Sequence, residues 1–309
     1  MSFRTRIAAG AALALLALAP SQRAAACSQC MCGDPFPTLA FGQPTPALFR
    51  YGLENRYLSK DNALADEPGR EDQRENRLAG FAMMHPADRV VLLARVPYVF
   101  KRIEESPDGA PSSIESAQGF GDAEALGRFR IARLRSTSGP GGGLALTAGF
   151  AAPTGRNHLT DDEGVRLEQH LQPGTGAWSG QAGLELAAPV GSFLVEADVM
   201  GRANGANDIG YHYGNALLYD VGAGTRRFGA WQFLAHVNGR SAAQDRVDDA
   251  GDLDPNSGGG VTYVAPGVRY FGVMGLVVDA GAQLPVIESL TGDQDEHATA
   301  RLSVSLAPW

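Results

Sequence analysis

The residues from Gly119 to Gly155 decide between two kinds of fold. They read Gly119-Phe-Gly-Asp122, then Ala123-Glu-Ala-Leu-Gly-Arg-Phe-Arg-Ile131, and end as Leu144-Ala-Leu-Thr-Ala-Gly-Phe-Ala-Ala-Pro-Thr-Gly155 after a Ser/Gly/Pro-rich turn. Side chains alternate across a strand, so the charged residues share one face and the apolar residues share the other. A soluble sandwich would turn the charged face outward, whereas a transmembrane barrel would turn it toward the lumen.

The order of strands and loops favours the barrel. We find twelve runs of roughly the 9–11 residues that a tilted membrane strand needs, joined alternately by long polar loops and tight turns. Outer-membrane barrels combine an even strand number with short periplasmic turns and longer outer loops. We therefore predict an all-β fold, a twelve-stranded antiparallel transmembrane β-barrel with both termini in the periplasm. The expected strands are 48–59, 77–84, 89–102, 123–131, 144–155, 177–188, 192–201, 215–227, 231–240, 261–270, 275–287 and 298–309.

The N-terminal residues resemble an export signal. Arg4 and Arg6 precede an apolar run over 7–19, and Ala24-Ala-Ala26 stands before Cys27. A positive start, a short apolar region and a small-residue cleavage site describe a secretory signal peptide. We expect a signal peptide over 1–26, a cysteine-containing periplasmic leader over 27–45 and an outer-membrane barrel over 46–309.

The amino-acid composition limits the classes of binding partner that this chain can have. The net charge of −8 and the lack of a basic run argue against nucleic acid. The expected surroundings are those of a Gram-negative outer membrane: its lipids and lipopolysaccharide, the barrel assembly machinery and a small-molecule solute.

The polar faces of the expected strands carry charges of both signs. A charged side chain facing lipid costs roughly 2–4 kcal/mol for Arg or Lys at the bilayer midplane, so these residues belong in the lumen. Two interpretations stay open, a water-filled pore and a salt-bridge network that fills a small barrel. The predicted pore-lining residues are Arg50, Glu54, Arg56, Arg95, Asp122, Glu124, Arg128, Arg130, Glu185, Glu196, Asp198, Asp220, Arg269 and Asp279.

All three cysteines lie in one short segment, Cys27-Ser-Gln-Cys30-Met-Cys32. In an exported protein, cysteines usually pair as disulfides, and three of them leave one over. Thiolates with a nearby thioether also suit a soft metal such as copper, and lipid attachment at Cys27 is a third alternative. No other cofactor is expected.

Five short motifs follow one another along the chain: Arg95-Val-Pro-Tyr98, Gly119-Phe-Gly-Asp122, Pro153-Thr-Gly155, Pro173-Gly-Thr-Gly-Ala-Trp178 and Gly210-Tyr-His-Tyr-Gly214. Their order over about residues 45 to 309 resembles that of the bacterial outer-membrane transporter family named after the MetA pathway of phenol degradation. The resemblance implies an outer-membrane barrel and solute passage. It implies no catalytic residue.

We therefore predict a passive channel or transport protein for small solutes, hydrophobic or aromatic ones included, and not an enzyme. One alternative is a scaffold that presents the cysteine leader to a metal, a redox partner or a protein. A minor alternative is a lipid hydrolase with a Ser/His site on the barrel wall, for which the candidate histidines are His158, His170, His212 and His297.

Overall fold

The computed structural model describes residues 48–64, 68–109, 111–134, 142–247 and 251–307. Within these ranges the chain is built almost entirely of strands, with one short 3-10 turn, η1 (Val273–Gly275). The strands are β1 (Phe49–Ala63), β2 (Gly69–Ala87), β3 (Val90–Pro107), β4 (Ser113–Phe120), β5 (Ala123–Leu134), β6 (Gly142–Ala152), β7 (Ser179–Val190), β8 (Phe193–Asn204), β9 (Ala216–Thr225), β10 (Trp231–Ala242), β11 (Gly259–Phe271), β12 (Leu276–Leu290), β13 (Gln294–Glu296) and β14 (Thr299–Leu306).

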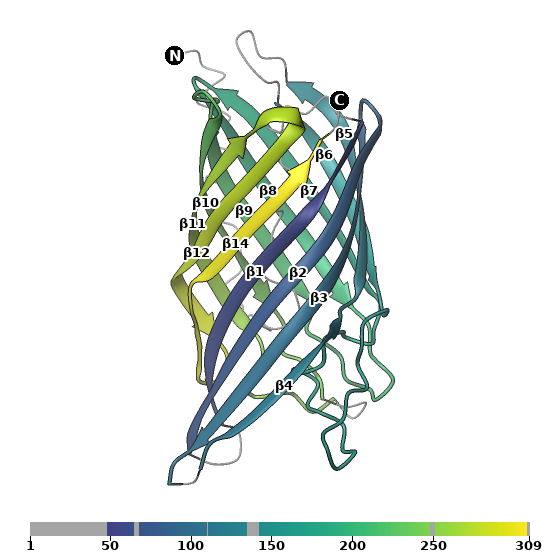
Figure 1. Ribbon diagram of the computed structural model, residues 1–309, viewed down its shortest axis with the longest axis vertical. Helices are drawn as coiled ribbons and strands as arrows, with labels where there is room; N and C mark the ends of the chain where they lie inside the picture. Colours follow the sequence, from purple (N-terminus) through teal and green to yellow (C-terminus); the bar gives the residue numbers. More distant parts are fainter. Residues whose placement is uncertain (1–47, 65–67, 110, 135–141, 248–250, 308–309) are drawn as a thin grey trace.

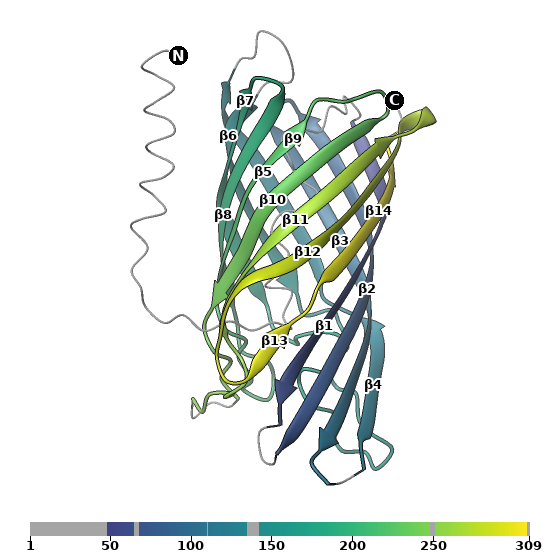
Figure 2. The same cartoon turned by 90° about the vertical axis from the view of Figure 1, so that its left-hand side faces the viewer.

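The strands close into an antiparallel barrel (Figures 1 and 2). β4 and β5 both pair with β3 and form one interrupted strand of the wall, and β13 and β14 both pair with β1 in the same way. Because β1 also pairs with β2, the first and last strands of the barrel seal its wall. The predicted twelve-stranded antiparallel barrel is confirmed.

The two ends of the barrel differ. Tight connections such as 88–89, 191–192 and 226–230 lie at one end, together with the start of β1 and the end of β14 (Figure 1). We call this the turn end. The long segments 153–178 and 205–215, and the residues 243–247 and 251–258, lie at the other, the loop end. Among the described residues, no helix is long and apolar enough to cross a membrane.

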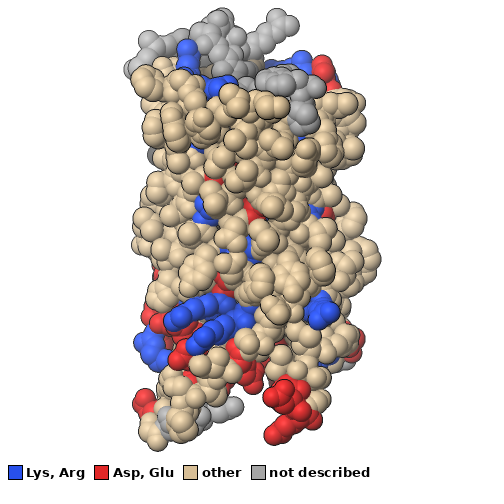
Figure 3. All heavy atoms as spheres, in the orientation of Figure 1, with Lys and Arg blue, Asp and Glu red and all other residues tan. Residues whose placement is uncertain are grey.

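The outer surface carries a broad apolar band. Figure 3 shows a largely uncharged wall between charged ends, with the larger group of acidic and basic side chains at the loop end. Aromatic residues line both margins of the band, as they do at the two interfaces of membrane barrels. Outward, exposed apolar side chains include Phe49, Tyr51, Leu53, Tyr57, Val96, Phe100, Phe120, Phe150, Trp178, Phe193, Trp231 and Phe233.

Two segments expected as polar loops are instead largely strand. β1 and β2 continue through most of 60–75, and β3 and β4 occupy most of 104–118. These extensions project past the loop end (Figure 2). Their outer faces carry ion pairs such as Arg74–Asp72, at 2.6 Å between Nη2 and Oδ2. Both faces of a projecting strand are polar, so alternation is lost from the sequence and the extension looks like a loop.

The N-terminal predictions lie outside the described residues. This applies to the signal peptide over 1–26, the leader over 27–45 and the cluster of Cys27, Cys30 and Cys32. The disulfide, metal and lipid alternatives for these cysteines therefore remain predictions.

The apolar band makes a prediction about stability in a bilayer. Leu53→Arg puts a cation on the lipid-facing side of β1, where Leu53 is exposed, and should lower the unfolding free energy in lipid vesicles by roughly 2–4 kcal/mol. The control is Ile114→Arg on the projecting strand β4, where the side chain is equally exposed and meets water. Denaturant titration in vesicles measures both. Equal losses for the two variants would contradict the assignment of the band to lipid.

Candidate functional site

The predicted pore-lining residues occupy the inner side of the wall. Thirteen of them come from β1, β3, β5, β7, β8, β9, β11 and β12, and Asp122 stands in the break between β4 and β5. Arg50 is 1% exposed, although its neighbours Phe49 and Tyr51 face outward. Their inner placement agrees with the alternation in the sequence. That they line an open pore remains a prediction.

Ion pairs join the inner faces of several strands into one belt. Glu54 on β1 accepts from Arg95 on β3 at 3.5 Å and from Arg301 on β14 at 3.1 Å. Arg95 also reaches Glu124 on β5, with 2.7 Å between Nη2 and Oε2, and Arg202 on β8 lies 3.9 Å from the other Glu124 oxygen. The belt therefore connects strands far apart in the sequence, including the two that close the barrel.

A second set of inner contacts ties the closing strands near the turn end. The Arg50 guanidinium donates to Ser305 Oγ at 2.8 Å and to Asp279 Oδ2 at 3.3 Å. Arg269 on β11 pairs with the same Asp279 carboxylate, and Arg128 on β5 pairs with Glu185 on β7. Arg269 and Asp279 lie on adjacent strands, whereas Arg50–Asp279 and Arg128–Glu185 each reach across one intervening strand.

Acidic residues gather on one side of the lumen. Glu196 and Asp198 lie on β8, Asp220 lies on β9, and His236 on β10 contacts Asp220 with 2.8 Å between Nδ1 and Oδ1. In the closed strand order, β8 to β10 stand across the barrel from β1 to β3. This part of the inner wall is acidic, and the cations Arg202 and Arg240 lie on the same strands toward the loop end.

An apolar strip also runs through this polar interior. Phe81 and Met83 on β2 pack with Val91 and Leu93 on β3 in one buried cluster near the turn end. A second cluster toward the loop end holds Met200, Tyr211, Tyr213, Ala216, Leu218 and Ala242. Leu126 on β5 packs against both clusters and joins them. The charged faces seen in the sequence gave no sign of this strip.

The loop segment 153–178 is anchored to the break in the wall. Asp122 accepts from the backbone N–H of Gly155 at 2.9 Å and of Thr175 at 2.8 Å, and from the Thr175 hydroxyl at 2.6 Å. The backbones of Gly155 and Gly174 touch there: a Cβ on Gly155 would lie 2.7 Å from the Gly174 Cα. Opposite the break, β3 carries Pro97, which has no N–H to donate, and its carbonyl accepts from Gly121 at 2.9 Å.

Further contacts hold the same segment against the inner wall. The Lys101 ammonium donates to the carbonyls of His170 and Gln172, both at 2.8 Å. Leu171, fully buried, packs against Ile103 on β3 and Ala117 on β4. The segment thus lies inside the loop-end mouth of the barrel and narrows it.

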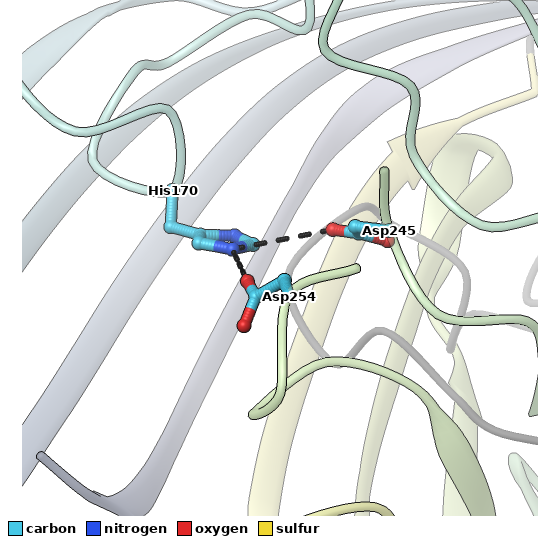
Figure 4. A group of neighbouring side chains, drawn as sticks. All are labelled: His170, Asp245 and Asp254. Atoms are coloured by element: carbon cyan, nitrogen blue, oxygen red, sulfur yellow. Dashed lines mark hydrogen bonds and ion pairs between the residues drawn. The ribbon is translucent and has the colours of Figure 1, made fainter. Parts of the chain in front are cut away.

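Four side chains join three loops, and we call them the latch: His170, Tyr211, Asp245 and Asp254. Figure 4 shows His170, Asp245 and Asp254 of this group. His170 Nε2 lies 2.9 Å from Asp254 Oδ2 and 3.0 Å from the Tyr211 hydroxyl. That hydroxyl donates to Asp245 Oδ2 at 2.7 Å, and Asp245 is completely buried. Each loop therefore contributes at least one partner.

The latch also contains the residue types of a metal site. The donor atoms of His170, Asp245 and Asp254 all lie within 4.8 Å of one another. The Tyr211 O–H, the backbone N–H of Gly214 and the His170 ring already satisfy these carboxylates. Hydrogen bonding thus accounts for the two carboxylates, whereas His170 Nδ1 is buried without a hydrogen-bond partner among the described residues.

The electrostatics of the latch favour the ion pair between His170 and Asp254. Burial by itself lowers the pKa of His170, but the hydrogen bond with Asp254 and the charges of Glu168 and Asp245 outweigh burial, so the pKa lies above its usual range. Burial raises the pKa of Asp254, yet the hydrogen bond and charge of His170 lower it overall. The nearby Lys60 ammonium opposes protonation of His170.

The sequence motifs meet in space at these contacts. Gly119–Asp122, Pro153–Gly155 and the start of Pro173–Trp178 converge on the Asp122 anchor, while Gly210–Gly214 supplies Tyr211 to the latch. Asp245 and Asp254 lie in an acidic loop, a signal equally typical of a solvated surface, and the sequence did not predict their contacts with Tyr211 and His170.

The four histidines considered for a hydrolase do not form one site. His158 is exposed beside Asp208, and His297 is exposed beside Asp61. His170 is buried in the latch, and His212 is half-buried, with its backbone N–H donating to the Arg246 carbonyl at 2.8 Å. In the described ranges no hydrogen bond joins a side chain of these histidines to a serine side chain.

Comparison with known proteins identifies the family of this chain. Residues 85–289 match the model of the family described as "Putative MetA-pathway of phenol degradation", and the chain belongs to that family. No curated protein sequence matches the chain.

Solved structures show the same fold at low sequence identity. An outer membrane channel from Pseudomonas putida F1 superposes with a TM-score of 0.65 at 14% identity, over 88% of this chain and 98% of that chain. The translocator domain of the autotransporter NalP from Neisseria meningitidis gives a TM-score of 0.50 at 10% identity, over 86% and 90%. The fold is therefore that of outer-membrane β-barrels.

The hydrogen bonds between Asp122 and the segment 153–178 lead to a prediction about how easily that segment opens. Asp122→Ala removes the acceptor of three hydrogen bonds. Hydrogen bonds to a charged group contribute roughly 1.5–3 kcal/mol each, so local opening of 153–178 should become easier by more than ~2 kcal/mol. Tryptic cleavage after Arg156 or Arg166 should accelerate. Asp88→Ala, which alters an exposed turn residue, is the control, and equal cleavage of both variants would refute the anchor.

The latch leads to a prediction about pH. A histidine with a raised folded pKa contributes stability fully below its unfolded pKa of ~6.5 and loses it as pH rises through the folded value. The lowered pKa of Asp254 gives a contribution present above ~3.9 and lost as pH falls through its folded value. The hydrogen bonds of the latch should therefore contribute most to stability between about pH 3.9 and 6.5. This contribution should decrease as pH rises through the raised pKa of His170.

Hydrogen–deuterium exchange of 205–215, corrected for the intrinsic pH dependence, measures this loosening. Protection should fall with rising pH in the native protein and be low throughout in His170→Gln. His297→Gln changes an exposed histidine and should retain the native profile. A profile of His170→Gln that follows the native one would show that the latch does not titrate as described.

Proposed function

We propose that this protein is a passive outer-membrane channel for small solutes, with hydrophobic or aromatic molecules among them. The observation that carries the proposal is the apolar strip joined by Leu126, a series of packed apolar side chains within an otherwise charged lumen. A solute with an apolar body can stay in contact with this strip while water and paired charges fill the rest of the lumen.

The comparisons support this proposal without defining the solute. The structure from Pseudomonas putida F1 is named an outer membrane channel, and the family description refers to phenol degradation. The inner ion pairs support passage of polar groups. Because the segment 153–178 packs against the inner wall at the loop-end mouth, we expect it to shift when a solute passes.

The orientation follows from the two ends. We assign the turn end to the periplasm and the loop end, with its longer polar segments, to the cell exterior, because outer-membrane barrels carry longer loops outside. The aromatic margins and the charged loop end then meet lipid and lipopolysaccharide. Insertion by the barrel assembly machinery belongs to the same proposal.

The test is conductance of the purified chain in planar bilayers. Discrete current steps in potassium chloride, reduced reversibly by phenol, are expected. Leu126→Ala interrupts the apolar strip and should weaken the reduction by phenol several-fold, whereas Leu146→Ala removes a side chain exposed on the outer wall and should leave it unchanged. Heat-modifiability on a denaturing gel verifies folding. A folded protein without current steps would overturn the channel.

A further inference from the structure

The turn end carries an exposed apolar patch on one side of its rim. Phe228, Val273 and Met274 are 81%, 81% and 84% exposed, the highest values among the large apolar side chains of the described residues. They lie in the turns 226–230 and 272–275, which join β9 to β10 and β11 to β12. We call these three side chains the rim patch. Exposed apolar side chains that gather at one place mark a surface that meets a partner or a membrane.

The two turns of the rim patch are neighbours in space. β10 pairs with β11 from Trp231 opposite Tyr270 onward, and the backbone N–H of Phe271 donates to the Ala230 carbonyl at 2.8 Å. The Trp231 and Tyr270 rings, 4.8 Å apart between centroids, stand at the aromatic margin of the outer band. The rim patch therefore continues the lipid-facing band past its margin at the turn end (Figure 2).

The backbone of Met274 is in an unusual conformation for a residue with a side chain. Its φ of 55° and ψ of 29° lie in the left-handed region, where the Cβ of an L-residue crowds the backbone. In the described ranges no other residue except glycine has a positive φ. A glycine would adopt this conformation freely, so the shape of the turn gives no reason for a methionine. The exposed Met274 side chain is thus available to pack against something outside the chain.

Cations accompany the rim patch, and no carboxylate of the same turns neutralises them. Arg226 and Arg227 are exposed in the first of the two turns. The two turns and the neighbouring segment 189–193 contain no Asp or Glu. Asp279, on β12, faces the lumen and pairs there with two arginines. The rim around the patch is therefore locally positive.

The remainder of the turn end is basic as well. Among the described residues, its exposed charged side chains are Arg89, Arg133, Arg226, Arg227 and Asp88. Asp88 pairs with Arg133 at 3.3 Å, which leaves the other three cations uncompensated at this end. This excess contrasts with the net charge of −8 for the whole chain, so the two ends of the barrel suit different surroundings.

Arg227 is positioned by an aromatic ring, which leaves its hydrogen-bond donors available. Its guanidinium carbon lies 4.1 Å from the centroid of the Phe271 ring, and the negative face of the ring attracts the cation. No hydrogen bond or ion pair joins this side chain to another described residue. Arg226, in contrast, donates to the Gly191 carbonyl at 3.0 Å. A guanidinium presents a fork of donors that matches two oxygens of a phosphate.

From this arrangement we propose that Arg227 and the rim patch form a binding site for anionic glycerophospholipids of the inner leaflet of the outer membrane. The lipid phosphate accepts from Arg227, and the acyl chains lie against Phe228, Val273 and Met274. Continuity with the lipid-facing band and the local excess of cations argue for this occupant. The inference rests on the proposed orientation, which turns this end toward the periplasm and so toward the leaflet that holds glycerophospholipids.

Lipid binding to the full chain in detergent measures the site independently of conductance. Native mass spectrometry should show saturable binding of dioleoyl phosphatidylglycerol. Dioleoyl phosphatidylcholine, which has the same acyl chains and no net charge, should bind at least roughly fivefold more weakly, the factor expected for one cation near an anionic lipid surface. Equal affinities for the two lipids, or no saturable binding of the anionic lipid, would overturn the site.

Variants then locate the site, with heat-modifiability as the check of folding. Arg227→Gln should reduce the preference for phosphatidylglycerol roughly fivefold. Met274→Gly, which suits the backbone conformation, should weaken the binding of both lipids alike. Arg102→Gln removes a half-exposed cation near the loop end and should bind as the native protein does. Full preference in folded Arg227→Gln, or unchanged affinity of Met274→Gly for both lipids, would overturn the assignment.

Two further readouts separate this inference from the channel and from its orientation. Current steps without a lipid preference overturn the lipid site and leave the channel intact, whereas a lipid preference without current supports the site and overturns the channel. Ser192→Cys, in a chain whose native cysteines are replaced by serine, places a thiol in the exposed turn between β7 and β8. A maleimide on a long polyethylene glycol should label it after the outer membrane is permeabilised. Labelling in intact cells would place lipopolysaccharide at this end and overturn the inner-leaflet lipid.

Discussion

A barrel wall in lipid must satisfy the hydrogen bonds of its backbone N–H and C=O groups internally, because the hydrocarbon offers no hydrogen-bond partner. Pairing of β1 with both β2 and β14 meets this requirement by removing the sheet edges. Closure then fixes the chemistry of both faces. Outward residues such as Leu53 meet lipid, and inward charges such as Arg50 and Glu54 must find partners within a narrow lumen. The ion-pair belt is thus a consequence of closure, and it in turn ties the closing strands together.

The barrel wall is interrupted next to the loop segment that narrows the lumen. Gly121 and Asp122 separate β4 from β5 opposite Pro97, and the freed Asp122 carboxylate binds the backbone of the segment 153–178. That segment packs against the inner wall and narrows the loop-end mouth. The latch joins it to the other two long loops. One break in the strand ladder therefore positions the loop segment and, through the latch, the loops that it contacts.

The sequence predicted the strands well where one face met lipid and the other met charge. All twelve expected strands are found, because alternation such as Phe49, Tyr51 and Leu53 against Arg50 and Glu54 is a period-2 signal that few other structures produce. Prediction failed at the projecting parts of β1 to β4, where both faces are polar. It missed the apolar strip because Phe81, Met83 and Leu126 look like ordinary apolar residues until closure turns them inward.

The sequence by itself determined that this chain forms a closed membrane barrel with charges inside and long loops at one end. Local alternation and turn spacing carry that information, since each depends only on residues near one another in the chain. Tertiary structure alone decided that Glu54 meets Arg301, that His170 meets Asp254, and that the turns 226–230 and 272–275 lie side by side. These pairs come from strands and loops far apart in the chain, and their distances follow from the register in which the barrel closes.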